Sequence, residues 1–359
     1  MKNKNILELC LAHGLGGLEM YVSSCYAEFS KKTVCKVVVN PGSKLDNYLN
    51  VSDKLYIKRN KFFPFIPALQ LANYIDKHEI DIIHFHWTKD IITAVLAKKM
   101  SRRKPKLVQS RHMQMTRFKN DIYHQWLYKN IDLIHSVTNK VHEQLKTFIP
   151  SSIRPQLKMI YLGVNKSNIQ EEKVKLLKKK YVLHDEFVIG IVGRIEEAKG
   201  QYKLIQAVHA IADLNIKVMI VGAVMQSAYL DTLKNMIKEY QLENKIIFTG
   251  FTNDVDTHMQ LFDVSILATE NETFGLVVIE SMVNGRMILS TKSGGPLEVI
   301  KDGVNGLFFD GSVNDLSEKL KFVYDNPDLR NNLVNNAYDT VLKFFDKKEQ
   351  LNKLYKELQ

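Results

Sequence analysis

The chain has 359 residues, more than a single hydrophobic core usually supports, so two domains are expected. Its 45% hydrophobic and 25% charged residues are typical of a globular protein, and no apolar run approaches the roughly 20 residues that a membrane-spanning helix needs. Three cysteines without metal-ligand spacing favour buried, reduced thiols in a cytoplasmic protein over disulfides or cysteine catalysis.

The positive charge is concentrated in the first half of the chain. The net charge is +11, but residues 1–165 hold 26 lysines and arginines against 12 acidic residues, whereas residues 166–359 hold 24 against 27. This asymmetry predicts an anionic partner for the first half: a membrane surface, a nucleic acid or a phosphorylated substrate.

Short apolar runs alternate along the chain with helix-length amphipathic stretches. The expected strands of the first half are Ile6–Ala12, Cys35–Asn40, Ile80–His86, Lys106–Ser110 and Leu133–Val137. Those of the second half are Phe187–Gly193, Ile216–Gly222, Ile246–Phe248, Val264–Ala268 and Met287–Ser290. Helices are expected between most of them, for example at Leu18–Ser30 and Tyr202–Asp213. This alternation predicts parallel sheets that are covered by helices on both faces.

A polar, charge-dense segment at residues 164–184 interrupts the series, and we interpret it as the connection between two domains. Residues 325–359 form a polar tail with helical patterning. The predicted fold is therefore α/β, with two Rossmann-like, doubly wound parallel-sheet domains that face each other across a cleft. Ligands of parallel sheets bind beyond the carboxyl ends of the strands, so the candidate site residues are expected there.

The first strand ends in a glycine-rich turn, His13-Gly14-Leu15-Gly16-Gly17, which leads into a helix. Glycines allow a ligand to approach backbone N–H groups closely, and a helix N-terminus attracts anions. A purely structural turn is the alternative interpretation.

A second candidate loop follows the strand that ends at Gly193. Arg194 and Lys199 stand five residues apart on it, and an arginine fork with a lysine charge can bind a diphosphate from both sides. A solvated loop is the alternative.

The third candidate is the stretch ATENETFGLVVIESM, which places Glu272 in a loop and Glu280 on the apolar face of a helix. A buried carboxylate costs several kcal/mol unless it is paired, so Glu280 needs either a buried cation or ligand hydroxyls such as a ribose diol. The backbone N–H groups of Phe274, Gly275 and Leu276 start the helix and can bind hydroxyls or phosphate.

These three motifs together resemble the retaining, nucleotide-sugar-dependent glycosyltransferases of the GT-B fold, and most closely their family 4. The resemblance rests on Glu272-x7-Glu280, on Gly-Arg-x4-Lys-Gly at 193–200 and on the turn at 13–19. Further motifs follow in the family's order: Val221-Gly222, Phe248-Thr249-Gly250-Phe251, Asp263, Gly294-Gly295-Pro296-Leu297-Glu298 and Asp302-Gly303-x2-Gly306. The resemblance implies an acceptor-binding domain at 1–165, a donor-binding domain at 166–339 and a terminal helix at about 340–359 that packs back on the first domain.

The resemblance also implies roles for single residues. The donor would be bound by Gly16, Gly17, Gly193, Arg194, Lys199, Gly222, Phe251, Glu272, Phe274, Gly275, Leu276 and Glu280. Among these, Glu280 would hold the ribose hydroxyls and Glu272 the transferred sugar. The catalytic set would be Glu272, His112, Arg194 and Lys199, with His112 near the anomeric centre. His13, His86 and Arg111 would lie on the acceptor side.

The expected chemistry needs no cofactor other than the nucleotide sugar. Retention of anomeric configuration without an evident nucleophile fits a front-face mechanism, in which the leaving phosphate helps to deprotonate the acceptor hydroxyl. No aspartate pair with metal-binding DxD spacing is evident, and the resemblance implies a transferase that works without a bound metal.

Basic residues beside aromatics in the first half suit an anionic membrane surface. They occur in KRNKFFPFIP (58–67), KKMSRRKPK (98–106) and RHMQMTRFK (111–119). We therefore expect a cytoplasmic protein, peripheral on the inner face of the cytoplasmic membrane, which transfers a sugar to a lipid-linked or lipopolysaccharide-type glycan.

Three alternatives remain at this stage. A nucleotide-sugar epimerase of the same fold lacks a matching set of acid and base carboxylates here. A non-enzymatic, transferase-like partner subunit is disfavoured by the joint presence of Arg194, Lys199, Glu272 and Glu280. A nucleic-acid-binding protein fits the pI of about 9.2, but no nucleic-acid-binding module is recognisable, so we expect no nucleic-acid partner.

Overall fold

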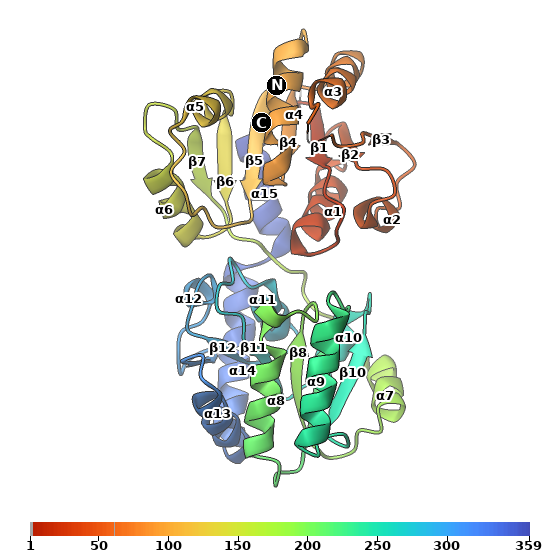
Figure 1. The fold of residues 1–359 in the computed structure, drawn as a ribbon, viewed down its shortest axis with the longest axis vertical. Helices are drawn as coiled ribbons and strands as arrows, with labels where there is room; N and C mark the ends of the chain where they lie inside the picture. Colours follow the sequence, from red (N-terminus) through yellow and green to blue (C-terminus); the bar gives the residue numbers. More distant parts are fainter. Residues whose placement is uncertain (1–2, 61) are drawn as a thin grey trace. The chain divides into compact units, whose positions relative to one another are not determined.

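The computed structural model describes residues 3–60 and 62–359, and the chain forms two compact units (Figure 1). The first unit contains the chain up to Leu162 together with Lys348–Gln359, and the second contains Gly163–Lys347. Each unit is a parallel sheet with helices packed on it, which confirms the predicted α/β class.

In the first unit the described residues form a seven-stranded parallel sheet of order β3-β2-β1-β4-β5-β6-β7. Its strands are β1 (Ile6–Cys10), β2 (Cys35–Val39), β3 (Lys54–Tyr56), β4 (Ile82–Phe85), β5 (Lys106–Arg111), β6 (Leu133–Ser136) and β7 (Gln156–Met159). Its helices are α1 (Gly17–Phe29), α2 (Lys44–Tyr48), α3 (Phe65–Lys77), η1 (Thr88–Asp90), α4 (Ile91–Met100), α5 (Ile122–Tyr128), α6 (Asn139–Phe148) and α15 (Lys347–Leu358).

In the second unit the described residues form a six-stranded parallel sheet of order β10-β9-β8-β11-β12-β13. Its strands are β8 (Phe187–Val192), β9 (Ile216–Val221), β10 (Ile246–Gly250), β11 (Val264–Leu267), β12 (Met287–Thr291) and β13 (Leu307–Phe309). Its helices are α7 (Glu171–Lys180), η2 (Glu197–Lys199), α8 (Gln201–Ala210), α9 (Ser227–Glu239), α10 (Val255–Met259), α11 (Leu276–Val283), α12 (Pro296–Val299), α13 (Val313–Asp325) and α14 (Pro327–Phe344).

The two faces of the first sheet differ in polarity. One face is apolar and packs Leu7 and Leu9 of β1 against Leu71 of α3, Ala94 of α4 and Leu127 of α5. The other face packs partly on α1, and there each of the four central strands has one buried polar residue: Glu8, His84, Ser110 and His135. Because side chains alternate across a strand, β1 can present leucines to one face and a glutamate to the other.

Ten of the described strands lie within one or two residues of the expected positions, and three others were missed. β3 and β7 are edge strands whose side chains are only partly buried, so they lack the apolar signature of a central strand. β13 is buried but only three residues long. The expected connection at 164–184 contains the helix α7, none of whose side chains is buried.

No helix in the described part of the chain combines the length and the apolar character that crossing a membrane requires.

Candidate functional site

The candidate residues of the second unit follow the carboxyl ends of neighbouring parallel strands. Gly193 and Arg194 follow β8, Gly222 follows β9, Phe251 follows β10, and Glu272 lies in the loop after β11. The topology therefore places these candidates along one edge of the sheet, as the sequence predicted.

An ion pair joins two of these loops. The Lys199 ammonium lies 3.1 Å from a carboxylate oxygen of Glu272, and the two side chains are about three-quarters buried, with 25% and 21% exposure. The other Glu272 oxygen accepts a hydrogen bond from the backbone N–H of Thr273 at 3.1 Å. Arg194 is instead paired with Glu196 of its own loop at 2.8 Å and is half exposed. The structure thus brings Lys199 and Glu272 together and holds Arg194 in a separate pair.

Glycines let the Glu272 loop pack against the segment after β12. A Cβ atom at Gly294 would lie 2.0 Å from the Glu272 carbonyl oxygen, and one at Gly295 would lie 2.3 Å from the Thr273 carbonyl oxygen. Gly294 also has a φ of +67°, which favours glycine. The Gly295 N–H donates to the Glu272 carbonyl at 3.1 Å. Backbone contact therefore fixes the position from which the Glu272 side chain extends.

This contact predicts that Gly294→Ala displaces the Glu272 backbone. Gly303→Ala is the matched control, because Gly303 has a similar φ of +71° and no neighbour within 4 Å of an added Cβ. Both variants should lose about 1 kcal/mol of stability from the left-handed conformation. Only Gly294→Ala should also lose ligand-dependent stabilisation, as measured by thermal unfolding with and without nucleotide. Equal behaviour of the two variants would contradict the role of this contact.

Glu280 lies on the side of α11 that is only partly covered by neighbouring residues. Gly275 starts the helix in a left-handed conformation with φ +84°, and Leu276 and Glu280, four residues apart, are half-buried. Val278 and Ile279 between them are fully buried. The expectation of a buried carboxylate is thus corrected: Glu280 is at the edge of the apolar face.

The Glu280 carboxylate has no hydrogen-bond or ion-pair partner among the residues that the structure describes. Burial and the nearby negative charge of Asp256 raise its pKa to about 7, against the weaker, opposite effect of Lys347. An acid that is half-ionised at neutral pH and lacks a partner within the protein is suited to accept hydrogen bonds from ligand hydroxyls.

In the first unit, the glycine turn leads into α1. Gly16 is the N-cap of this helix and Gly17 its first residue, and both are accessible. His13 is exposed, and the Asn40 amide nitrogen lies 2.9 Å and 3.1 Å from its two ring nitrogens. The turn therefore presents backbone N–H groups at the carboxyl end of β1.

His86 and His112 meet at the carboxyl ends of β4 and β5. His86 Nδ1 lies 3.4 Å from His112 Nε2, and the other His86 nitrogen lies 2.7 Å from the Glu8 carboxylate. Burial and the neighbouring histidines lower the pKa of His112 well below its ordinary value, and burial lowers that of His86 to about 4, so both rings are neutral at pH 7.

Arg111 is used within the first unit. Its guanidinium donates to the carbonyls of Met113 and Gln114 at 2.8 Å and 3.0 Å and to the Thr88 hydroxyl at 3.0 Å. These bonds fix the loop after β5, next to His112.

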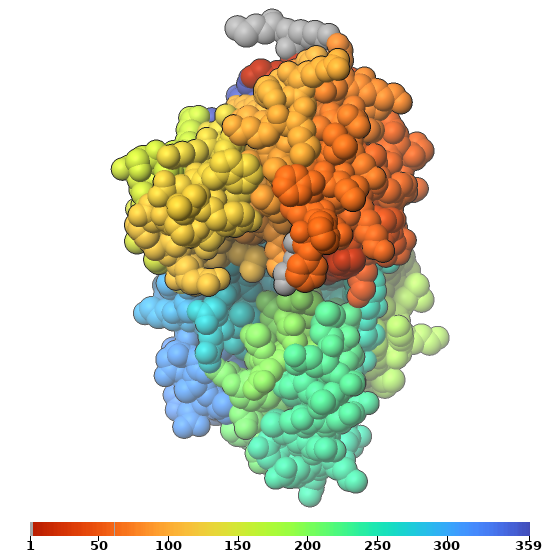
Figure 2. Space-filling model, turned by 45° about the horizontal axis from the view of Figure 1, so that its top comes forward, coloured from red at the N-terminus to blue at the C-terminus, as the bar shows by residue number. Residues whose placement is uncertain are grey.

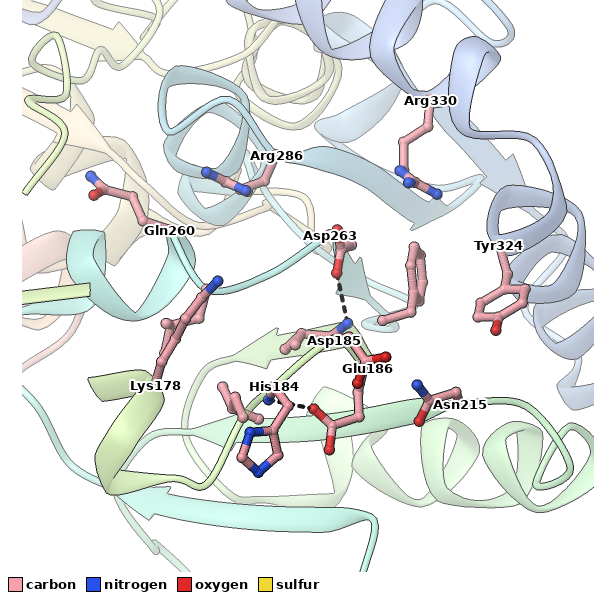
Figure 3. Close-up of a pocket in the computed structure, with 14 residues that line it drawn as sticks. Lys178, His184, Asp185, Glu186, Asn215, Gln260, Asp263, Arg286, Tyr324 and Arg330 are labelled. Atoms are coloured by element: carbon pink, nitrogen blue, oxygen red, sulfur yellow. Dashed lines mark hydrogen bonds between the residues drawn. The ribbon is translucent and has the colours of Figure 1, made fainter. Parts of the chain in front are cut away.

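A pocket of about 310 Å³ lies at the other edge of the second sheet (Figure 3). Its lining includes Glu186 just before β8, Asp263 just before β11 and Arg286 just before β12, so it lies at the amino ends of these strands. Asp263 accepts a hydrogen bond from the Val188 N–H at 2.8 Å, and Arg286 donates to the Phe262 carbonyl at 2.9 Å. These groups support the strand starts, away from the candidate residues.

The buried polar face of the first sheet, next to His112, was not predicted from the sequence. Glu8 interrupts the apolar run ILELC in the same way that Glu280 interrupts its own, and this was the signal that could have revealed it. His84, Ser110 and His135 belong to the same buried group.

Comparison with known proteins identifies the family. The family model described as Glycosyl transferases group 1 matches residues 172–340, and the one described as Glycosyltransferase Family 4 matches residues 15–168. The chain is 25% identical over 326 residues to the putative glycosyltransferase EpsD of Bacillus subtilis, which covers 86% of this chain and 84% of that protein.

Two further matches are informative. One is N-acetylgalactosamine-N,N'-diacetylbacillosaminyl-diphospho-undecaprenol 4-alpha-N-acetylgalactosaminyltransferase of Campylobacter jejuni, 28% identical over 225 residues, or 62% of this chain and 58% of that protein. The other is a crystal structure of Anabaena HepE in complex with UDP and glucose, which has a TM-score of 0.87 and 19% identity over 99% of both chains. The chain belongs to the group 1 and family 4 glycosyltransferases, and its two sheet-containing units have the GT-B fold.

Proposed function

We propose that this glycosyltransferase moves a hexose or N-acetylhexosamine from a nucleoside-diphosphate sugar to a lipid-linked or lipopolysaccharide-type glycan in bacterial surface polysaccharide synthesis. A UDP-sugar is favoured, because HepE shares the fold and was crystallised with UDP and glucose. A lipid-linked acceptor is favoured by the Campylobacter relative, whose name specifies a diphospho-undecaprenol acceptor.

The ion pair between Lys199 and Glu272 is the observation that carries the donor assignment. It places a cation suited to a diphosphate 3.1 Å from a carboxylate suited to sugar hydroxyls, at the strand edge where ligands of parallel sheets bind. A donor that bridges these groups would replace the ion pair with two new contacts, the phosphate to Lys199 and a hydroxyl to Glu272. Half-exposed Arg194 would add a second cation for the phosphate.

The reaction proceeds in this proposal with retention and without a metal. Lys199 and Arg194 stabilise the negative charge that develops on the departing diphosphate, and stabilisation of this kind is usually the largest single contribution to catalysis. The leaving phosphate takes part in deprotonating the acceptor hydroxyl on the same face of the sugar. Glu272 holds the transferred sugar, Glu280 holds the ribose, and His112 orients the sugar near its anomeric carbon.

Thermal unfolding with UDP, GDP, ADP or no nucleotide tests the donor assignment. A nucleotide at a hundred times its dissociation constant should stabilise the protein by about 2.7 kcal/mol, which raises the midpoint measurably. We expect UDP to give the largest shift. A larger shift with GDP would reassign the base, and no shift with any nucleotide would contradict the donor site and favour a partner-subunit role.

The acceptor surface in this proposal is on the first unit and includes a membrane-binding patch. We define the patch as two groups of exposed apolar side chains. One group lies just before α3 and in its first turns, and the other lies in the segment that leads into α5 and in its first turn. Its members are Phe62, Phe63, Phe65, Ile66, Leu69, Met113, Phe118, Ile122 and Tyr123, which are 51% to 87% exposed. Both segments are visible on the face of the first unit in Figure 2, α3 in orange and residues 113–123 in yellow. Residue 61 of the basic motif lies outside the described residues.

Aromatic side chains next to lysines and arginines suit the headgroup region of an anionic membrane, where each cation contributes about 1 kcal/mol. The protein should therefore sediment with anionic liposomes, and Phe62→Ala/Phe63→Ala should weaken this binding several-fold. Phe322→Ala/Phe344→Ala is the matched control, because it removes two aromatics of the second unit that are 45% and 51% exposed. Equal binding to neutral and anionic liposomes, or equal loss in both variants, would contradict the patch.

A further inference from the structure

A continuous chain of polar contacts crosses the buried face of the first sheet. It runs over four neighbouring strands, from Glu8 of β1 through His84 at the end of β4 and Ser110 of β5 to His135 of β6. All four side chains are fully buried. Glu8 faces His84 and Ser110 faces His135 in the strand register, so the pairing of strands builds the chain. A buried polar group without a partner would cost several kcal/mol, so each contact here has a definite donor.

The contact at the His135 end of this series fixes the direction of all its hydrogen bonds. His135 Nε2 lies 2.8 Å from the Ile160 carbonyl oxygen, which can only accept, so this nitrogen carries a proton. Burial lowers the pKa of His135 to about 3, so the ring is neutral and its Nδ1 must accept. The Ser110 hydroxyl, 2.7 Å away, therefore donates to His135 and accepts from His84 Nε2, also at 2.7 Å.

Because His84 Nε2 already carries a proton, the contact between His84 and Glu8 needs a second one. His84 Nδ1 lies 3.0 Å from one Glu8 oxygen, and this contact needs a proton on either the ring or the carboxyl. Burial would raise the pKa of Glu8, but the hydrogen bonds from His84 and His86 and the interaction with His84 outweigh it and hold that pKa below its ordinary value. The proton of this contact therefore lies on His84 Nδ1, and the Glu8 carboxylate accepts the hydrogen bond.

The second Glu8 oxygen fixes the direction of the hydrogen bonds that lead through His86 to His112. A carboxylate only accepts, so His86 Nε2, 2.7 Å away, donates to it. Neutral His86 then has a lone pair on Nδ1, which accepts from His112 Nε2 at 3.4 Å. His112 is also neutral, so its Nδ1 is an acceptor, and the residues that the structure describes offer it no partner. The Tyr21 ring packs edge-on against the His112 ring, with 5.1 Å between the ring centroids, and limits the rotation of the imidazole.

We propose that Glu8 is a positioning residue for sugar transfer, which acts through His86 to hold the proton of His112 on Nε2 and to present Nδ1 as a hydrogen-bond acceptor for a sugar hydroxyl. This inference rests on the proposed function, because there His112 orients the donor sugar. The carboxylate that sets the acceptor nitrogen is thus two side chains away from the ligand, in the centre of the sheet.

Three variants separate this role from a merely structural one. Glu8→Gln can donate to His84 and accept from His86, so it keeps the hydrogen-bond order without the charge. Glu8→Leu has a similar volume but cannot form hydrogen bonds, so it no longer fixes their direction through His86 to His112. Ser110→Ala cuts the chain at an equally buried place, but leaves the contacts from Glu8 to His112 intact. If Glu8→Leu does not fold, His86→Phe replaces it in the test. This variant removes the contacts of His86 with Glu8 and His112 and leaves the pair of Glu8 and His84.

The test combines the tautomer of His112 with steady-state kinetics. Proton–nitrogen correlation spectra of protein labelled with ¹⁵N-histidine give the tautomer, and His112→Gln assigns its signals. We expect the Nε2-protonated form in the unaltered protein, in Glu8→Gln and in Ser110→Ala. In Glu8→Leu we expect mixed tautomers and a turnover number at least about tenfold lower, with little change in the donor KM.

Several outcomes would overturn the proposal. They are an Nδ1-protonated His112 in the unaltered protein, normal turnover of Glu8→Leu, and an equal loss in Ser110→Ala. Stoichiometric zinc in the purified protein would do so as well, because the ligand atoms of Glu8, Cys25, His84 and His86 lie within 4.8 Å of one another and a metal would replace the hydrogen bonds. If the unaltered protein transferred no sugar, the proposed function would fail, while the tautomer would still decide the hydrogen-bond order.

Discussion

Glu272→Gln should lower the turnover number of this transferase about a hundredfold, and leave the affinity for free nucleotide within about twofold. The amide keeps the size of the side chain, but it removes the charge that pairs with Lys199 at 3.1 Å and that we assign to the hydroxyls of the transferred sugar. A contact to the sugar that strengthens as charge develops affects the chemical step, whereas a free nucleotide does not reach it. Initial rates with saturating donor, and nucleotide titrations by calorimetry, separate the two effects.

Glu270→Gln is the matched control for this variant. Glu270 is on the same loop and is also paired with a lysine, Lys203, at 2.6 Å, but its side chain is exposed and no site role is assigned to it. It should retain nearly full activity. A loss in Glu270→Gln as large as that in Glu272→Gln would mean that the loop, and not the Glu272 carboxylate, is needed. Normal turnover of Glu272→Gln would remove Glu272 from the proposed mechanism.

Binding of a UDP-sugar should strengthen about tenfold to thirtyfold between pH 5.5 and pH 8, because Glu280 must ionise to accept two ribose hydroxyls. Its pKa of about 7 in the free protein means that the carboxyl is largely protonated at pH 5.5. Binding at pH 7 should release about half a proton, since half of the carboxyls are still protonated there. Calorimetry in buffers of different ionisation enthalpy measures this release. UDP-glucose and UDP-N-acetylglucosamine are suitable probes, because their diphosphate does not titrate in this range.

Glu280→Gln should lose most of this pH dependence and, in the free protein, gain stability. The folded-state pKa is raised from 4.5 to about 7, so the group stabilises the fold fully below pH 4.5 and loses this contribution as the pH rises through 7. At pH 8 the ionised, half-buried carboxylate costs about 1–2 kcal/mol after allowance for solvent, which the amide avoids. Urea unfolding at pH 5 and pH 8 measures the gain. A variant that binds like the parent at both pH values would show that Glu280 does not contact the nucleotide.

The sequence was sufficient to place the donor candidates, because their placement needs only local information. Alternating strands and helices locate the strand ends, and all carboxyl ends of a parallel sheet lie along one edge, so Lys199 and Glu272 could be expected to approach each other. The family resemblance then supplied the roles that geometry alone leaves open. The exposure of Glu280 required the structure, since helical periodicity does not show how closely the next layer packs.

The buried network around Glu8 could not be predicted in the same way. Glu8 and His84 are 76 residues apart, and Ser110 and His135 are 25 apart. Their contacts depend on the register of three separate strand pairs, and a shift of one residue would turn each side chain to the other face. The short edge strands β3 and β7 escaped prediction for a related reason: they are only partly buried and carry little apolar pattern.

The return of the chain end to the first unit has a consequence for folding during synthesis. Leu351, Leu354 and Leu358 of α15 are buried, and Tyr355 packs 5.5 Å from Phe29. The ribosome therefore completes all of the second unit before it releases the segment that the first unit needs. The half of the protein that is translated first is the last to be finished, and until then it has an uncovered apolar surface. A chain cut off after Asp346, which keeps the second unit but lacks α15, should have a second unit that resists protease, while its first unit is cleaved.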